Sequence, residues 1–329
     1  MIRGCSVRTP LILSILFMSE LGFLHEVTGH SKLSSQLALE HWICEKKDHL
    51  ISKLDNTGAI LFSGMPVKDA NDFDHFVSTF QFKPFTYEES LSNAVRINKT
   101  DKVFTANEAP REIEIYLHHE LAQTPVYPRY IFFFCASASE LGGETPICRS
   151  DHLYSKVLEE DPELMKKFEE FGVIYNSIMS NGDELDSGQG RSWQKTLGAA
   201  TKEKAEKNLH NLGYKWKWIN KDELLVTTRV FKAVKTLTGD TKSFFNQVLA
   251  ASLGWKNNST LALPPVLFGN GDLIREPSIR LVSEAAESIT LLRKWSDGDI
   301  LMIDNHRVMH GRKPFSGNKT REVLVSLTA

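Results

Sequence analysis

The feature that most constrains the fold is a pair of polar segments that lie far apart in the chain, Leu117–Glu120 and Asp304–His310. In an extended segment, residues two apart point to the same face, so His118 and Glu120 would project together. His310 would add a second imidazole. Two nitrogens and one carboxylate oxygen, with the other positions open, form the ligand set of non-haem Fe(II) centres. A fold that uses this set must bring both segments together.

The composition is that of a globular protein with a large core. The chain has 329 residues, 41% hydrophobic and 24% charged, with a net charge of -2. No basic block is present, which argues against nucleic-acid binding. The cysteines form no C-x-x-C pair, so a zinc ribbon or a thioredoxin-like site is not predicted. We expect free cysteines, with Cys135 in an apolar run and Cys148 both buried; the others are Cys5 and Cys44.

The first 29 residues admit two interpretations. A basic start followed by the apolar run Pro10–Leu24 is typical of a signal peptide, although no clear cleavage site follows. The alternative is a leading strand at Leu11–Leu16. The run is too short to span a membrane. An Fe(II) site favours a reducing compartment, so we expect a cytoplasmic protein, with a secretory signal left open. Residues 30–329 are predicted to form a single domain.

Hydrophobic periodicity predicts a mainly β protein decorated by helices. The predicted helices are Ser34–Leu54, Asp69–Phe80, one helix capped by Ser150 or Asp151 that runs to Phe171, and Arg275–Trp295. The predicted strands are Ala59–Phe62, Tyr130–Ala138, Ile147–Arg149, Val173–Ile178, Tyr214–Ile219, Leu224–Val234 paired with Lys242–Phe245, Asp299–Ile303 and Arg321–Leu327. Many strands with interspersed helices favour a jelly roll of the cupin kind. Loops as long as residues 180–200 often close over active sites as lids, so we expect a lid here.

The last predicted strand carries an arginine in line with apolar side chains. Arg321, Val323 and Val325 share one face by the period of two. Arg321 could lie at the solvated start of the strand. If it points inward it needs an anion, because a buried guanidinium without a partner is costly. Arginine is suited to holding a carboxylate through two hydrogen bonds. A return of the chain after His310 would bring this group near the three proposed ligands.

Four ordered motifs carry a resemblance to a known family. They are Leu117–Ala122, the Gly-Gly-Glu-Thr-Pro turn at 142–146, Asp304-Asn305 followed by His310-Gly311-Arg312, and Arg321. Together they resemble the taurine dioxygenase (TauD/TfdA)-like family of Fe(II)/2-oxoglutarate-dependent oxygenases, and most closely its clavaminate synthase-like proteins. The resemblance spans roughly residues 55–329.

The resemblance implies a fold, a reaction and a set of roles. The fold would be a double-stranded β-helix, and the iron ligands would be His118, Glu120 and His310. Thr145 and Arg321 would hold the far carboxylate of 2-oxoglutarate. The enzyme would use O2 to oxidise, by hydroxylation in the simplest case, a small amino-acid-like substrate, with release of succinate and CO2. A halogenating relative would lack the Glu120 carboxylate.

Other polar residues are weaker candidates for the site. His119 would turn away from His118, and His306 would suit a second ligand only on a helix. Asn107, Arg229 and the 180–195 loop are candidates for substrate contact. Arg229 would favour an anionic substrate, whereas a salt bridge at a strand edge is the simpler account.

Two other function classes stay open from the residues alone. One is a cupin-like binding protein without turnover, and the other is a zinc hydrolase that uses the same three ligands. The hydrolase gives Arg321 no role, so replacement of Arg321 by Leu separates it from an oxygenase. The primary substrate and the oligomeric state, a homo-oligomer included, are not encoded in these motifs.

Overall fold

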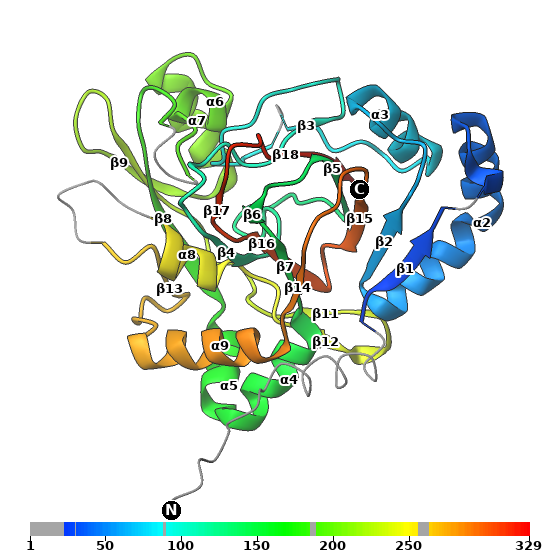
Figure 1. Cartoon of the computed structure of the whole chain (residues 1–329). Coiled ribbons are helices and arrows are strands. Elements are labelled where there is room, and N and C mark those ends of the chain that lie inside the picture. The colour runs from blue at the N-terminus through cyan, green and yellow to red at the C-terminus, as the bar shows by residue number, and fades with distance from the viewer. Residues whose placement is uncertain (1–22, 30, 88–89, 185–188, 256–262) are drawn as a thin grey trace, which may run out of the picture.

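A strand-rich centre is flanked by groups of helices in the computed structural model, which describes residues 23–29, 31–87, 90–184, 189–255 and 263–329 (Figure 1). The Leu11–Leu16 segment and the signal-peptide interpretation therefore lie outside the described residues. The helices and short 3-10 turns are η1 (Ser31–Leu33), α2 (Gln36–Thr57), α3 (Ala70–Thr79), α4 (Ser150–Glu160), α5 (Pro162–Phe171), α6 (Trp193–Leu197), α7 (Lys202–Leu212), η2 (Thr238–Asp240), α8 (Val248–Gly254) and α9 (Glu276–Ile289).

The largest sheet has six strands in the order β1-β2-β15-β5-β18-β3. The β1–β2 pair is parallel, and the other pairs are antiparallel. Its central strands are buried along nearly their whole length, which explains their continuous apolar sequence. The strands are β1 (His25–Thr28), β2 (Ala59–Ser63), β3 (Phe104–Thr105), β5 (Tyr130–Ser137), β15 (Ile300–Asp304) and β18 (Glu322–Thr328).

A four-stranded sheet, β14-β7-β16-β4, packs against the six-stranded one. One buried cluster joins the two sheets, with Ile147 and Val308 from the smaller sheet beside Phe133 and Val325 from the larger. In the smaller sheet β16 lies opposite β4, with His310 paired to His118. The four strands are β4 (Ile115–His118), β7 (Thr145–Arg149), β14 (Leu291–Arg293) and β16 (Val308–Arg312).

A third sheet of four strands lies to one side, in the order β13-β8-β10-β9. Two small pairs complete the strands: β11 with β12, and β17 with β6. The strands of these three sheets are β6 (Leu141–Gly142), β8 (Val173–Met179), β9 (Lys215–Trp218), β10 (Leu224–Thr227), β11 (Lys235–Thr236), β12 (Lys242–Ser243), β13 (Val266–Phe268) and β17 (Phe315–Ser316).

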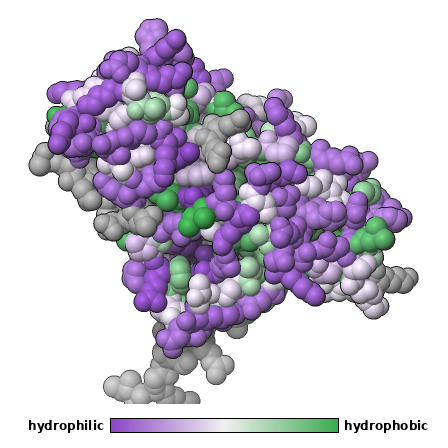
Figure 2. Space-filling model, turned by 90° about the horizontal axis from the view of Figure 1, so that it is seen from above, coloured by the Kyte–Doolittle hydropathy of each residue, from purple (hydrophilic) through white to green (hydrophobic). Residues whose placement is uncertain are grey.

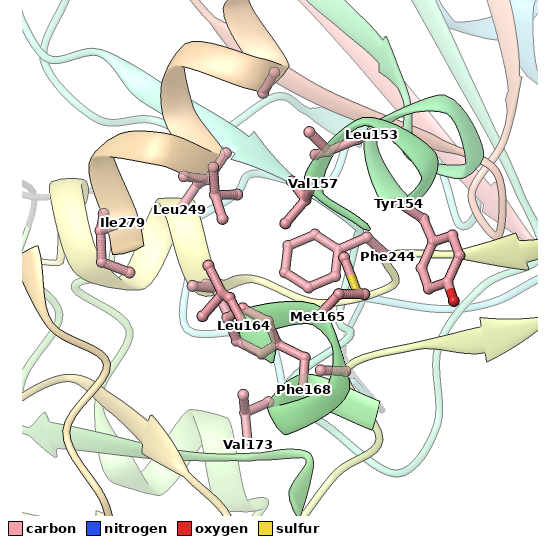
Figure 3. Close-up of a cluster of buried hydrophobic side chains, with 14 of the residues drawn as sticks. Leu153, Tyr154, Val157, Leu164, Met165, Phe168, Val173, Phe244, Leu249 and Ile279 are labelled. Atoms are coloured by element: carbon pink, nitrogen blue, oxygen red, sulfur yellow. The ribbon is translucent and has the colours of Figure 1, made fainter. Parts of the chain in front are cut away.

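Helices α4, α5, α8 and α9 pack with residues of neighbouring strands and loops in a second hydrophobic core, shown in Figure 3. The Phe168 ring contacts Phe244 edge-on at a centroid distance of 4.9 Å. Such offset and edge contacts are the favoured geometry of aromatic pairs. Helix α8 also packs against β4, and so it supports the strand that ends at His118. The members of this core in the figure include Leu153, Val157, Leu164, Met165, Val173, Leu249 and Ile279.

The helices near the N-terminus confirm the sequence prediction. The Ser35 side chain accepts a hydrogen bond at the start of α2, and Asp69 does the same for α3. Gly58 ends α2 at φ 84, in the left-handed region that favours glycine. Helix α3 packs Phe73, Phe76 and Val77 inward, as their spacing predicts.

The predicted helix that runs to Phe171 is wrong as a single unit. It divides into α4 and α5, because Pro162 cannot continue a helix and instead occupies the first turn of the next one. Asp161 caps α5 by accepting from the Leu164 N–H. Neither Ser150 nor Asp151 caps α4, whose preceding residue Arg149 makes no side-chain cap.

Two further predictions need correction. The predicted strand Leu224–Val234 ends at Thr227, and it pairs with β8 and β9 rather than with Lys242–Phe245. Only the short β11–β12 pair forms across the 238–240 turn. The predicted helix Arg275–Trp295 ends at Ile289, and the chain continues as β14 beside β7. Pairing with a neighbouring strand overrides the apolar spacing there.

The surface seen from above is largely hydrophilic, with small scattered hydrophobic areas (Figure 2). Within the described residues no helix has the length and apolar character needed to cross a bilayer.

Candidate active site

His118, Glu120 and His310 converge in the wall of a cavity that is also lined by residues of both main sheets. One ligand-type atom from each lies within 4.8 Å of the others. Glu120 Oε2 is 3.6 Å from His310 Nε2 and 4.0 Å from His118 Nε2. Strand β4 ends at His118, so Glu120 lies in the following turn and not in the strand. The side chains of His118 and Glu120 nevertheless project toward each other, as predicted. Together with His310 they form a group that could hold a metal ion.

The tautomer of His118 follows from its partner. Its Nδ1 lies 2.8 Å from the Tyr116 carbonyl oxygen, which can only accept, so Nδ1 carries the proton. The Nε2 lone pair is therefore directed toward the other donors, as metal-binding histidines require. Burial, reinforced by the nearby His310, lowers the pKa of His118 to about 4. His310 Nδ1 is buried without a hydrogen-bond partner in the described part of the chain.

The Glu120 carboxylate is buried beside an arginine that the sequence did not single out. Arg96 Nη2 donates to both oxygens, at 2.9 and 3.0 Å, and the two side chains are 7% and 6% exposed. Burial alone would raise the pKa of Glu120, but Arg96 and the two histidines hold it below its usual range. The carboxylate thus stays ionised and available as a ligand. No motif spacing marks Arg96, which lies in the irregular stretch before β3.

Asn305 fixes the backbone of Glu120. Its side-chain oxygen accepts from the Glu120 N–H at 2.8 Å, and its amide donates to the Glu120 carbonyl at 3.1 Å. The same amide donates to the Pro128 carbonyl at 2.9 Å. Asn305 is fully buried, so these bonds replace water completely. The turn after β15 therefore sets where the carboxylate of the turn after β4 points.

Thr145, the first residue of β7, and Arg321, which directly precedes β18, line the same cavity. The Thr145 hydroxyl oxygen accepts from Trp295 Nε1 at 3.0 Å, which leaves its proton free to donate. Arg321 Nε donates to the Gly143 carbonyl at 3.1 Å. No ion pair of Arg321 occurs in the described chain, and burial lowers its pKa to about 10. A buried guanidinium without an ion pair is costly, so Arg321 is able to bind an anion at this position.

The glycine pair before Thr145 has a steric reason. Gly143 has φ 72, and a Cβ there would lie 2.9 Å from Arg321 Nε and 2.5 Å from Ser139 Oγ. A side chain at this position would push Arg321 away from the cavity. The Gly-Gly-Glu-Thr-Pro turn thus makes room for the arginine.

The residues predicted to contact substrate separate in space. Asn107 lines the cavity, where its side-chain oxygen also accepts from the Ala109 N–H at 3.0 Å. Gln189, from the 180–195 loop, lines it as well, whereas residues 185–188 are outside the described chain. Arg229 is exposed, packs on the Phe231 ring at 5.4 Å and lines a different pocket. Arg229 therefore does not line the cavity of the three candidate ligands, and nothing in that cavity supports the predicted substrate contact.

Neither His119 nor His306 lines the cavity of the three candidate ligands. The His119 ring stacks on Phe245 at 4.5 Å, and its Nδ1 contacts the Asn305 carbonyl. Arg129 hydrogen-bonds to His306 Nδ1. Burial, with Lys235 and Arg129 nearby, lowers the pKa of His306 to about 3.

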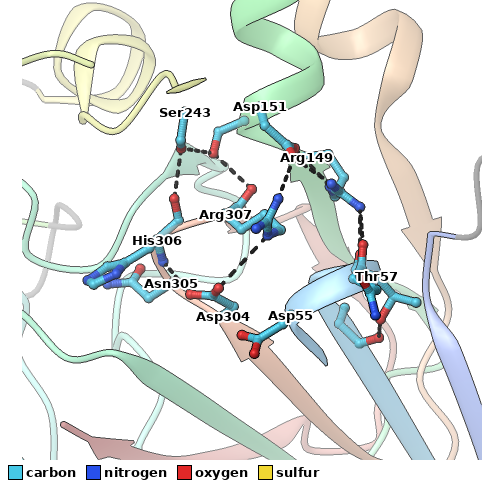
Figure 4. A network of polar contacts seen from close by, with 12 residues as sticks. Asp55, Thr57, Arg149, Asp151, Ser243, Asp304, Asn305, His306 and Arg307 are labelled. Carbon is cyan, nitrogen blue, oxygen red and sulfur yellow. Dashed lines mark hydrogen bonds and ion pairs between the residues drawn. The ribbon is translucent and has the colours of Figure 1, made fainter. Parts of the chain in front are cut away.

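A polar network anchors the turn between β15 and β16 (Figure 4). Asp151 accepts from Arg149 at 2.8 Å and from Arg307 at 2.7 Å. Asp304 accepts from the His306 N–H at 2.9 Å. Ser243 donates to the His306 carbonyl at 2.7 Å. These bonds fix the entry into β16, and hence the position of His310.

A sequence model of the taurine catabolism dioxygenase TauD, TfdA family matches residues 27–327. The chain belongs to this family. A clavaminate synthase-like protein of Arabidopsis thaliana is 34% identical over 288 residues, which cover 86% of this chain and 84% of the relative. A dapdiamide synthesis protein of Enterobacter agglomerans is 28% identical over 288 residues, covering 83% of both chains. The resemblance inferred from the four motifs is confirmed.

Solved structures show the same fold at low sequence identity. AAD-2 in complex with Mn(II) and N-oxalylglycine has a TM-score of 0.52 and 15% identity, with 94% of both chains covered. A taurine dioxygenase from Burkholderia xenovorans has a TM-score of 0.54 and 11% identity, covering 93% of this chain and 85% of that one. The mixed fold with many strands is therefore that of the TauD dioxygenases.

Family membership gives the class of chemistry. The chain is an Fe(II)/2-oxoglutarate-dependent dioxygenase, with iron as its metal, 2-oxoglutarate as co-substrate and O2 as oxidant. The donor set agrees with this, because two imidazoles and one ionised carboxylate leave coordination positions open.

Proposed function

We propose that this dioxygenase hydroxylates a small, amino-acid-like substrate at iron held by His118, Glu120 and His310. The balanced reaction is R–H + 2-oxoglutarate + O2 → R–OH + succinate + CO2. The main support for this proposal is that three donor atoms converge within 4.8 Å of one another. Arg321, a buried guanidinium without an ion pair in the described chain, lines the same cavity. We further propose that the two facing sheets form a double-stranded β-helix of the cupin kind.

Iron, when bound, would supply the site that activates O2 and oxidises the substrate C–H bond. The protein's part is to fix the ligands. Tyr116 holds the His118 ring through its carbonyl, and Asn305 holds the Glu120 backbone. These hydrogen bonds orient the two ligands, and the bond at Nδ1 also raises the basicity of the His118 ring.

Thr145 and Arg321 would hold the far carboxylate of 2-oxoglutarate. The threonine hydroxyl can donate one hydrogen bond and the guanidinium two, and bidentate pairing fixes direction as well as affinity. Their placement supports this assignment, because both side chains line the cavity that contains the ligand group.

The remaining lining suits a small substrate with polar and apolar parts. Asn107, Gln123 and Gln247 offer amides, whereas Tyr116 and Trp255 offer aromatic surface that keeps water out. Asn107 stays our candidate for a substrate contact.

The test is conversion of 2-oxoglutarate to succinate by the anaerobically loaded Fe(II) protein on admission of O2. We expect Fe(II)-dependent succinate formation. Arg321→Leu should weaken 2-oxoglutarate binding by at least about a hundredfold, because charge-assisted hydrogen bonds contribute roughly 1.5–3 kcal/mol each. Arg280→Leu, an exposed arginine on α9, is the matched control and should bind normally.

The two alternatives predict other results. A silent binding protein would bind 2-oxoglutarate but form no succinate with any substrate. A zinc hydrolase would show no 2-oxoglutarate affinity, and Arg321→Leu would change nothing. Either outcome contradicts the proposal.

A further inference from the structure

A second pocket adjoins the turn that follows Glu120, and it shares no described lining residue with the cavity of the three candidate ligands. The residues of this turn alternate between the two spaces. Leu121 and Gln123 line the active-site cavity, whereas Ala122 and Thr124 line the second pocket. The volume of the second pocket, 460 Å³, is in the usual range of small-molecule sites, roughly 300–1,000 Å³. The pocket is therefore large enough for a ligand of its own.

The lining of this pocket is strongly basic. Arg229, Lys232 and Lys235 line it, and no acidic residue does so within the described chain. None of these three side chains makes an ion pair there. Other lysines with exposed side chains, such as Lys242 and Lys319, have carboxylate partners. The whole chain has a net charge of -2, so the pocket concentrates positive charge against the overall balance and favours an anion.

Aromatic rings hold two of the three cations in place. Lys235 Nζ donates to the Tyr127 hydroxyl oxygen at 2.9 Å. It also lies 4.9 Å from the centroid of the Tyr127 ring and 5.4 Å from that of Phe245. The Arg229 guanidinium lies 5.4 Å from the centroid of Phe231. Cations at such distances are attracted by the face of the ring, so both side chains are positioned before a ligand arrives.

The backbone is anchored on both sides of Lys232. Phe231 exchanges two hydrogen bonds with Val173 through its N–H and carbonyl, both at 2.8 Å. The carbonyl of the fully buried Ala233 accepts from Asn246 Nδ2 at 3.1 Å. Lys232 is exposed between these two anchors. The fold itself therefore sets the position of this basic wall.

The donors and rings of the pocket indicate the class of anion. Because the Tyr127 hydroxyl oxygen accepts from Lys235, its proton is free to donate. A phosphate monoester carries nearly two negative charges at neutral pH and several acceptor oxygens, which suits three cations better than the single charge of a carboxylate. The rings of Phe231 and Phe245 offer a surface for an apolar group attached to the phosphate.

We propose that this pocket binds a small organic phosphate, with the phosphate among Arg229, Lys232 and Lys235 and the organic part against the aromatic rings. The inference goes beyond the proposed function and does not depend on it, because the pocket is separate from the candidate iron and 2-oxoglutarate sites. Phe245 stacks on the His119 ring at 4.5 Å. The ligand thus lies beside the segment of the candidate metal ligands without entering the substrate cavity.

The test uses phenyl phosphate as the probe. Its binding is measured by isothermal titration at low ionic strength, with the active site filled by Mn(II) and N-oxalylglycine. Inorganic phosphate and benzyl alcohol test the charge and the ring separately. We expect one phenyl phosphate per chain, bound at least tenfold more tightly than either comparison compound. Lys235→Met and Arg229→Gln should each weaken its binding about tenfold or more, because each removes a charge-assisted hydrogen bond.

Lys217→Met is the matched control, because Lys217 is an exposed lysine on β9 that does not line the pocket. It should bind phenyl phosphate normally. Lys232→Gln changes an exposed side chain and should weaken binding even where Lys235→Met is unstable. The proposal is overturned by the absence of saturable binding, or by equal affinity in Lys232→Gln, Arg229→Gln and the control. Inorganic phosphate that bound as tightly, or phenyl phosphate that displaced N-oxalylglycine, would overturn it as well.

Discussion

The two faces of the ligand segments use their polar atoms in opposite ways. On the cavity face, His118 Nε2 and the two terminal nitrogens of Arg321 make no hydrogen bond within the described residues, and Glu120 Oε2 accepts from Arg96. On the outer face, Asn305 makes three side-chain hydrogen bonds, and His306 is held by Arg129. The outer face therefore uses its hydrogen bonds to hold the backbone in position, whereas polar atoms of the cavity face stay available to a ligand.

The largest effect should come from the cavity face. His310→Ala removes one of the three converging donors, and Mn(II) binding should fall below detection in an isothermal titration. The fold should persist, because the ring makes no hydrogen bond through Nδ1 in the described chain. Mn(II) binding that survived this change would show that His310 is not a metal ligand.

A smaller loss of metal affinity is expected from a change at Asn305, which does not bind metal but holds the Glu120 backbone. Asn305→Ala leaves the Glu120 N–H and carbonyl without partners, at a cost of about 1–3 kcal/mol for each group. Metal affinity should fall about 10–100-fold, as for other residues that orient ligands.

The control for this variant is Asn176→Ala. Asn176 is also buried and uses its side chain to bind Thr227 and the Pro264 carbonyl, away from the cavity. It should lose comparable stability in urea unfolding and keep its metal affinity. Equal losses of metal affinity in the two variants would mean that Asn305 has no specific hold on Glu120.

The smallest effect should come from His306→Gln, and it concerns pH. The pKa of His306 is lowered to about 3 in the folded protein by burial and by Lys235 and Arg129. The unfolded chain, with a pKa near 6.5, therefore binds the proton first, and stability is lost as pH falls from about 6.5 toward 3.

The His306→Gln variant should show a shallower decline of unfolding free energy across that window, with Mn(II) affinity at neutral pH unchanged. Chemical unfolding at a series of pH values measures the first property and titration the second. A variant as pH-sensitive as the wild type would show that other groups cause the decline.

Periodic patterns predicted the elements that pack by local rules. Helices α2 and α3 and strands β2, β5 and β15 follow from apolar spacing and from caps such as Ser35. The break between α4 and α5 at Asp161-Pro162 could have been predicted from the sequence, because proline cannot continue a helix. The short strand β14 was not readable, because it forms only by pairing with β7.

The candidate site divides in the same manner. Residues in compact motifs, such as His118, Glu120 and Thr145, could be chosen from the sequence, and the cavity contains them. Arg96 could not, because its meaning arises from a contact with Glu120 that no spacing encodes. The place of Arg229 could not be predicted either, because β10 ends before it and leaves it exposed outside the cavity.

A crystal structure of the anaerobic protein with Mn(II) and 2-oxoglutarate tests the central claim most directly. We predict the metal on His118 Nε2, Glu120 Oε2 and His310 Nε2, with the far carboxylate of 2-oxoglutarate on Arg321 and Thr145. A metal bound elsewhere, or a co-substrate that does not touch Arg321, would contradict the account.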